Sequence, residues 1–428
     1  MRASELNLLI YFKTAVLITQ GIAVFFFLAP SHESIGTVFL VASLFVSAII
    51  RCNETTKVRF LYTISAIFLT FIWLPLLGYE GWKIYFFIYA GAFLAGFATF
   101  KNMRDRQLAF ILVFFLPWVA HLLIGAQQIG RHLLTFNATD FQHLLVTSKS
   151  SLSVGVKYYS SILSFVIVSS WVLFGMIKNA IWKYCFVLAL FLLSLIDNRV
   201  ALFSVTLSMI IYYLTFRKSI EAVHAANHTF RLMIGVGVIL MFIVYYPRLV
   251  LGYESVIAAL NFQEYHSWED NDLFLKEFCK GVGSQCTVDQ SVFYRLSWFF
   301  WGLSVVYDNP MGVGLGAGPL DRALALYDMH TGEYLARDFH SELMNIAVVF
   351  GVPGALFVFA LFGLIFLAFK KKMIVANNEI CFRLAYVFLS LLFLRFVIES
   401  VGGVGMYLFL SLLFAAITTE ATRVSKSV

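Results

Sequence analysis

Charged residues are scarce in this chain of 428 residues: Asp, Glu, Lys and Arg make up only 13% of it, whereas 61% is hydrophobic. About a quarter of a typical soluble domain is charged, so this composition excludes an ordinary soluble protein. The apolar runs also lack the alternation of apolar and polar residues that marks transmembrane β-strands, which excludes a closed barrel. We therefore expect an all-α, polytopic membrane helix bundle.

Continuous apolar stretches of about 20 residues, long enough to cross a bilayer, recur along the chain. The first one lacks a small-x-small cleavage site, so we expect a retained helix and not a signal peptide. The sequence predicts twelve transmembrane helices, at 8–29, 35–50, 60–77, 84–100, 108–124, 154–177, 181–196, 200–216, 232–246, 341–369, 382–397 and 402–418. They divide the chain into nine helices within residues 1–246, one large loop at 247–340, and three helices within 341–428.

Basic residues are distributed unevenly among the predicted connectors. When the connectors are assigned alternately to the two sides, one side carries clusters such as Arg51 with Lys57 and Lys370 with Lys371, and the short connectors opposite carry almost none. The positive-inside rule places the basic side and both termini in the cytoplasm. The formal charge of +7 is explained by this topology without nucleic-acid binding. An internal inverted repeat, typical of many transporters, is not visible.

An aromatic segment in the large loop contains a single cation, Arg295. Trp and Tyr favour the headgroup level of a bilayer, and an arginine beside them can extend its guanidinium to water. We therefore predict an interfacial helix at about 291–307 on the outer leaflet. The alternative is a short core helix of a folded loop. Arg295 is either an anchor at the membrane surface or part of an anion site.

Cysteine is also rare, with five in the chain, and two of them, Cys279 and Cys286, lie in the large loop. A flexible glycine-containing stretch separates them and could close a ring. Because the loop is expected to face an oxidising compartment, we predict a structural disulfide between them. The alternative is two free thiols.

Two more polar residues stand at the ends of predicted spans. Arg199 needs a partner at the membrane edge, either Asp197 beside it or an anionic ligand. His340 comes just before the tenth span, where Asp338 is a suitable N-cap that would place His340 in the first helical turn. The positive end of that helix disfavours an imidazolium, and a neutral imidazole suits a general base. Glu342 either orients the imidazole or complements the helix dipole.

Motifs for nucleotide or metal binding are missing. The glycine-rich run at 312–318 looks like a phosphate loop, but no Lys-Ser/Thr follows it and no strand precedes it, so turn formation explains the glycines. No group of His, Cys, Asp and Glu has the spacing of a metal site.

The order of these features resembles the O-antigen ligase and polymerase superfamily of bacterial inner-membrane glycosyltransferases. The motifs that carry the resemblance are Asp197-Asn-Arg199-Val-Ala-Leu, Tyr294-Arg295-Leu-Ser-Trp, Asn309-Pro-Met-Gly-Val-Gly-Leu-Gly, Phe339-His340-Ser-Glu342-Leu and Gly351-Val-Pro-Gly354. The topology is similar along the whole chain, and the motif similarity is confined to 196–204 and 291–354. Asn198 departs from the more common Ser or Thr before the first arginine.

The resemblance implies an O-antigen ligase, which transfers a glycan from undecaprenyl diphosphate to the lipid A-core oligosaccharide at the periplasmic face of the inner membrane. It implies that His340 is the catalytic base and that Arg199 and Arg295 hold the diphosphate, with Glu342 and Arg337 as supporting candidates. It further implies no cofactor and no metal. The expected partners are the lipid-linked donor, the lipid A-core acceptor and membrane lipids, with no nucleic acid.

Two alternatives stay open within and outside this superfamily. A polymerase uses the same donor, but often has two large outer loops, whereas one loop dominates here. Ile210 also stands where a common polymerase motif has Gly. Outside the superfamily, a flippase or transporter for a lipid-linked sugar would need ionisable residues along a path at mid-membrane depth. The basic residues of this chain lie mainly in loops and at span ends, which favours an enzyme at one face.

Overall fold

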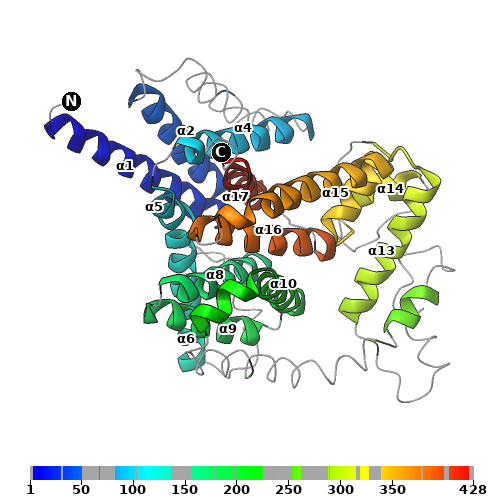
Figure 1. The fold of residues 1–428 in the computed structure, drawn as a ribbon. Coiled ribbons are helices and arrows are strands. Elements are labelled where there is room, and N and C mark those ends of the chain that lie inside the picture. Colours follow the sequence, from blue (N-terminus) through cyan, green and yellow to red (C-terminus); the bar gives the residue numbers. More distant parts are fainter. Residues whose placement is uncertain are drawn as a thin grey trace. The chain divides into compact units, whose positions relative to one another are not determined.

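The structure is a computed structural model, and it describes part of the chain. The residues it describes are 3–29, 32–50, 67, 82–102, 105–135, 156–177, 179–196, 198–224, 235, 253, 255–261, 288, 290–314, 319–326, 339–376, 379–399 and 404–423. Every regular element in these ranges is a helix, which confirms the predicted all-α class (Figure 1).

The helices follow the apolar runs of the sequence closely. They are α1 (Ala3–Phe27), α2 (Glu33–Ile50), α4 (Trp82–Asn102), α5 (Arg106–Phe110), the π-helix η3 (Ile111–Phe115), α6 (Leu116–Thr135), α8 (Val156–Ile177), α9 (Ala180–Ile196), α10 (Arg199–His224), α13 (Gln290–Asp308), α14 (Pro319–Leu326), α15 (Glu342–Ala376), α16 (Ile380–Ile398) and α17 (Val404–Arg423). Ten of the twelve predicted spans coincide with these helices. The other two, 60–77 and 232–246, lie outside the described residues apart from Ile67 and Gly235.

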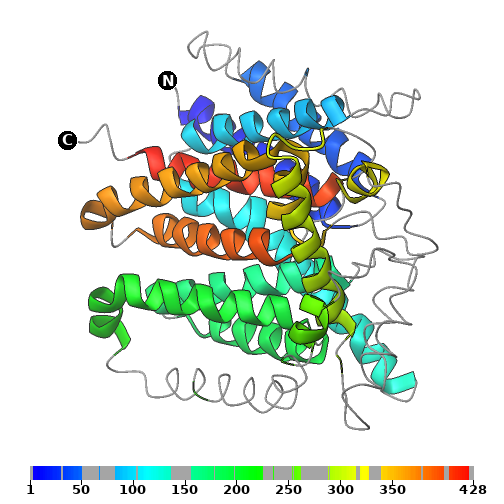
Figure 2. The same ribbon diagram turned by 90° about the vertical axis from the view of Figure 1, so that its right-hand side faces the viewer.

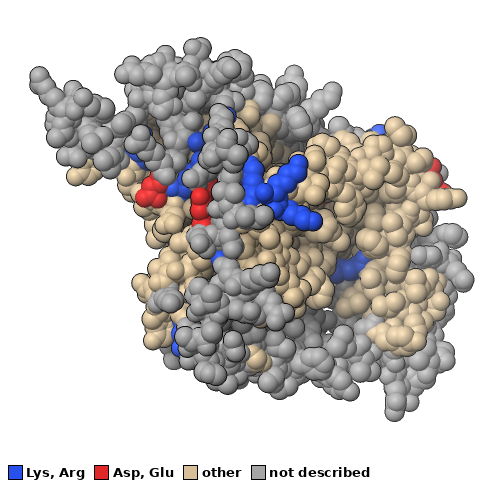
Figure 3. Space-filling view, in the orientation of Figure 1, with Lys and Arg blue, Asp and Glu red and all other residues tan. Residues whose placement is uncertain are grey.

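Five helices of the described part are long and apolar enough to cross a membrane. They are Arg106–Arg131, Val156–Ile177, Glu342–Met373, Ile380–Ile398 and Gly405–Thr422. Four shorter apolar helices accompany them, and much of the visible surface of the described residues is uncharged (Figure 3). These features are those of a helical membrane protein. The total of twelve spans and their sidedness stay predictions.

The chain forms two compact units. The first contains Met1–Val223, Leu364–Phe393 and Gly402–Val428, and the second contains His224–Gly363 and Leu394–Val401. In the first unit, α1 packs on α2, α4 on α17 and α8 on α9. The helices α8, α9 and α10 lie side by side in both views (Figures 1 and 2). The predicted loop at 247–340 falls within the second unit.

Small residues let helices of the first unit approach closely. A Cβ added at Gly96 of α4 would lie 2.9 Å from the Cβ of Ala415 of α17. A Cβ added at Gly125 of α6 would lie 2.1 Å from the ring of Tyr159 of α8, whose hydroxyl donates a hydrogen bond to the carbonyl of Leu122 at 3.1 Å. Close packing over small residues is the usual way in which membrane helices associate, because lipid provides little hydrophobic driving force between them.

The second unit has its own apolar core, to which α13, α14 and the start of α15 contribute. The predicted helix at 291–307 is present as α13. Phe293, Trp298 and Val305 are buried in the core, whereas Tyr307 at the end of α13 is 86% exposed. One face of α13 therefore packs in the core of the second unit. This agrees with the alternative interpretation of the sequence, a short core helix of a folded loop. Its position at a leaflet surface stays a prediction.

The helix α15 is broken near its start. Gly351 has φ 69° and ψ −163°, which is not helical, and Pro353 follows two residues later. A proline has no N–H, so the carbonyl of Val349 loses its helical partner. The N–H of Val352 bonds outside the helix, so the carbonyl of Val348 loses its partner too. Unpaired backbone groups are strongly unfavourable in apolar surroundings, so the break requires other partners.

The turn at 309–314 supplies these partners. Three hydrogen bonds join it to the break: Val313 N–H to Val348 O at 2.8 Å, Gly314 N–H to Val349 O at 3.0 Å, and Val352 N–H to Pro310 O at 2.9 Å. Gly312 and Gly314 adopt φ of 85° and 84°, values that glycine adopts without steric penalty. The glycines at these two positions are therefore turn formers, as predicted, and the turn completes the backbone hydrogen bonding of the broken helix.

Candidate functional site

His340 has an unusual backbone conformation. Its φ of 54° is the only positive φ of a non-glycine residue in the described part of the chain. For a residue with a Cβ, this conformation costs about 1–2 kcal/mol. It persists only where neighbouring contacts enforce it, and such strain is concentrated at functional sites. His340 is partly exposed, so a ligand can approach it.

Phe339 fixes the backbone on the N-terminal side of His340. Its side chain is fully buried and its ring stacks on Trp301 of α13, with the ring centroids 5.7 Å apart. Its N–H donates a hydrogen bond to Oδ1 of Asn345 at 2.9 Å. Gly302 permits this packing, because a Cβ there would lie 3.0 Å from the Phe339 ring. The aromatic helix α13 therefore holds the segment that carries His340.

Ser341 fixes the C-terminal side. Its hydroxyl accepts a hydrogen bond from the N–H of Met344 at 3.2 Å and donates one to the carbonyl of Val397 in α16 at 2.7 Å. An acceptor for the N–H of the third helical residue is the mark of an N-cap. Ser341 is therefore the N-cap of α15, which begins at Glu342.

This position of Ser341 corrects the predicted cap. The sequence predicted that Asp338 caps the helix and that His340 lies in its first turn, which is wrong because α15 begins only at Glu342. His340 is instead the residue before the N-cap, and Asp338 lies outside the described residues. Ser341 is the cap because its hydroxyl can reach a helical N–H and a carbonyl of α16 at the same time. His340 still adjoins the positive end of the helix dipole.

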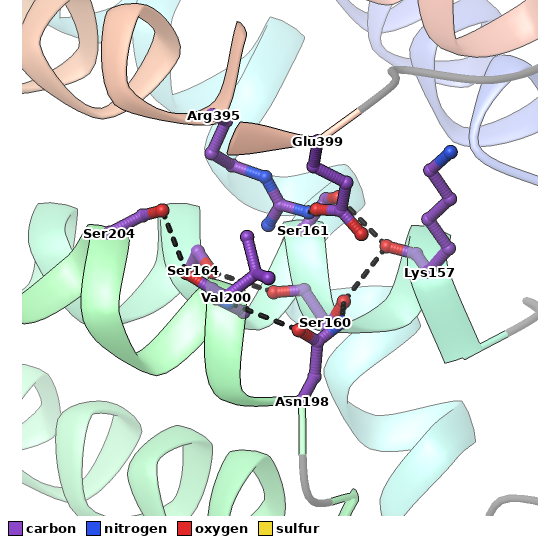
Figure 4. A network of polar contacts seen from close by, with 10 residues as sticks. Lys157, Ser160, Ser161, Ser164, Asn198, Val200, Ser204, Arg395 and Glu399 are labelled. Atoms are coloured by element: carbon purple, nitrogen blue, oxygen red, sulfur yellow. Dashed lines mark hydrogen bonds and ion pairs between the residues drawn. The ribbon is translucent and has the colours of Figure 1, made fainter. Parts of the chain in front are cut away.

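Two buried carboxylates lie near the same helix start. The N–H of Glu342 donates a hydrogen bond to the carbonyl of Glu399 at 3.3 Å, and both residues are buried. The carboxylate of Glu399 forms an ion pair with Arg395, four residues earlier (Figure 4). A buried carboxylate needs such a partner, because removal from water disfavours an isolated charge.

Sequence reasoning gave neither Arg395 nor Glu399 a role. The signal that could have identified the pair is an Arg and a Glu four residues apart at the end of an apolar span. Glu342 was proposed from sequence as a supporting residue. Its backbone contact with Glu399 now places it beside that ion pair.

Arg295 lies on α13, the helix that holds Phe339 through Trp301. It is partly buried, and neither of the ion pairs Arg106–Glu420 and Arg395–Glu399 includes it. The structure thus places Arg295 and His340 in one unit, on segments that pack against each other through Trp301 and Phe339. A partly buried arginine on a segment that packs against the segment of His340 can bind an anionic ligand.

Arg199 is the first residue of α10 in the first unit, and its side chain lies outside the described part. Asn198 caps this helix, because its Oδ1 accepts a hydrogen bond from the N–H of Ala201 at 3.1 Å. Its Nδ2 donates one to Ser160 Oγ of α8 at 2.7 Å (Figure 4). The Asn that departs from the Ser or Thr of the resemblance therefore still serves as a cap. That Arg199 shares a site with Arg295 and His340 stays a prediction.

Three further candidates, Arg337, Cys279 and Cys286, lie outside the described residues. Within the ranges described, Cys185 is a free thiol, and no group of three or more His, Cys, Asp or Glu is placed to hold a metal ion. Comparisons of the chain with models of known protein families, with curated proteins and with solved structures found no match.

Proposed function

We propose that this protein is an O-antigen ligase, a membrane glycosyltransferase that moves a glycan from undecaprenyl diphosphate to the lipid A-core oligosaccharide. The observation that carries the proposal is the strained, partly exposed His340, held between Phe339 and Ser341 at the start of a candidate membrane helix. The order of Arg199, Arg295 and His340 along an apolar chain supports it. The proposal places the reaction at the periplasmic face of a Gram-negative inner membrane, with both termini in the cytoplasm.

In the proposed reaction, the imidazole of His340 removes the proton from a hydroxyl of the lipid A-core. The hydroxyl oxygen attacks the anomeric carbon of the donor, and the bond from that carbon to the diphosphate oxygen breaks. Negative charge builds on the leaving diphosphate, and preorganised guanidinium groups stabilise it. Arg199 and Arg295 have this role in the proposal, since guanidinium groups bind phosphate oxygens through two parallel hydrogen bonds.

Substitution of the two arginines tests this role. We expect Arg199→Ala and Arg295→Ala each to lower kcat/KM about 10- to 100-fold, because a hydrogen bond to a charged group contributes about 1.5–3 kcal/mol. Arg199→Lys and Arg295→Lys keep the charge but lose the planar fork, and should recover only part of the rate. The measurement is transfer of radiolabelled donor by the purified protein. Arg131→Lys, a change at an exposed arginine of α6, is the control, and wild-type rates in both alanine variants would contradict the diphosphate role.

Deletion of the gene tests the function as a whole. The lipopolysaccharide of the deletion strain is separated on a gel, with a complemented strain as control. A ligase predicts a core without O antigen, together with accumulated lipid-linked polymer. A core that carries a single repeat unit would instead indicate the polymerase. An unchanged ladder would reject both and favour the transporter or another glycan.

A further inference from the structure

The break in α15 lies one membrane thickness away from a cluster of lysines. The 18 residues from Val352 to Phe369 separate it from Lys370, Lys371 and Lys372. At about 1.5 Å per residue they extend about 27 Å, close to the roughly 30 Å of a hydrocarbon core. Leu356, which is 61% exposed, is one of several apolar side chains that face outward on this stretch. Lysines at the end of a membrane helix favour the headgroup layer. If Lys370, Lys371 and Lys372 lie in the headgroup layer of one leaflet, the length of the helix places the break in the headgroup layer of the opposite leaflet.

The backbone hydrogen bonds between the break and the turn at 309–314 fix the depth of the turn. Pro310 bonds directly to Val352, so the turn and the end of α13 lie at the same level as the break. The depth of the turn follows from the membrane crossing of α15 and from the position of the lysines, and does not depend on the proposed reaction.

The residues exposed at this level are those found at a membrane surface. Tyr307 is 86% exposed and Met311 is 77% exposed. Asp308 is exposed beside them, and Arg322 of α14, also exposed, donates a hydrogen bond from Nε to the carbonyl of Val313 at 3.1 Å. A tyrosine, an arginine and apolar side chains together suit the headgroup layer, where the apolar part of a side chain can contact acyl chains while its polar end contacts water. An exposed aspartate excludes a position deep in the hydrocarbon.

We propose that Tyr307 and Met311, here named the lipid rim, contact the headgroups and upper acyl chains of the leaflet at the start of α15. The lipid rim continues the outward-facing apolar surface of α15 and sets the depth of the second unit in the bilayer. It differs from the interfacial helix predicted from sequence, because only the end of α13 and the following turn contact lipid. The nine residues from Glu342 to Phe350 then extend about 14 Å along the helix axis between the break and Ser341, the residue after His340.

Photocrosslinking tests the lipid rim in the full-length protein. The photoreactive residue p-benzoylphenylalanine replaces Tyr307, Met311 or, as a reference deeper in the membrane, Leu364, which is 66% exposed on α15. Each variant is reconstituted in vesicles of phosphatidylethanolamine and phosphatidylglycerol and irradiated. Mass spectrometry then identifies the adducts and the lipid carbon to which each is attached. All three positions are highly exposed, so the substitutions should leave folding intact.

We expect lipid adducts at 307 and 311, attached to the glycerol or the first half of the acyl chain, and adducts at 364 attached to the terminal half. Absence of lipid adducts at 307 and 311 while 364 reacts would overturn the proposal. Attachment at 307 and 311 to the terminal half would overturn it as well, since the turn would then lie deep in the bilayer. Crosslinks at the rim to a second copy of the chain in place of lipid would assign the surface to self-association.

Discussion

The variant His340→Ala should transfer glycan about 10²- to 10⁴-fold more slowly than the wild type, the usual contribution of a general base. The reason is that the alanine cannot accept the proton of the attacking hydroxyl, whereas the segment around it stays fixed by Phe339 and Ser341. The measurement is the rate of transfer from lipid-linked donor to lipid A-core by purified protein. Thermal unfolding in detergent shows whether the variant is folded.

The variant His340→Gly separates a catalytic role from a structural one. Glycine adopts the φ of 54° without the steric penalty of a Cβ, so the variant should unfold at or above the wild-type temperature. It should be as inactive as His340→Ala, because it also lacks the imidazole. His340→Asn offers a third comparison, since asparagine tolerates this backbone region and has no basic nitrogen. Full transfer by any of these well-folded variants would rule out His340 as the base.

The variants Gly312→Ala and Gly351→Ala should each lower the free energy of unfolding by about 3 kcal/mol or more. An added Cβ at Gly312 would lie 2.3 Å from the carbonyl oxygen of Val349, and one at Gly351 would lie 2.1 Å from that of Pro310. Both glycines have positive φ, which adds about 1–2 kcal/mol of backbone strain per alanine. Because backbone atoms cannot move aside, the turn must separate from the break, and its hydrogen bonds are lost.

Gly363→Ala is the matched control for these two variants. Gly363 lies in α15, the helix that contains Gly351, and an added Cβ there meets no atom within 4 Å. Since alanine is the better helix former by about 1 kcal/mol, this variant should be as stable as the wild type or slightly more stable. Denaturation of the three variants in the same detergent compares them directly. Equal stability of all three would show that the turn and the break are not packed as described.

The fold class and the position of most helices could be predicted from sequence because they depend on local composition. An apolar run of the right length becomes a helix in a membrane, since its backbone groups must bond within the segment. The same reasoning predicted the helix at α13 and the turn-forming glycines, of which Gly312 and Gly314 are described. It also singled out Arg199, Arg295 and His340, each a polar residue in an apolar setting.

Contacts between segments distant in sequence decided the rest. The cap of α15 is Ser341 because Val397 of α16 supplies an acceptor for the same hydroxyl, and no local pattern contains that information. The strained backbone of His340 depends on contacts of its two neighbours with α13 and α16. The break at Gly351 is stable only because a turn about 40 residues earlier in the chain bonds to its free carbonyls. The sequence alone thus determined which segments are helices and which residues are unusual, whereas only the tertiary structure decided how they are capped, strained and paired, because those properties arise from long-range contacts.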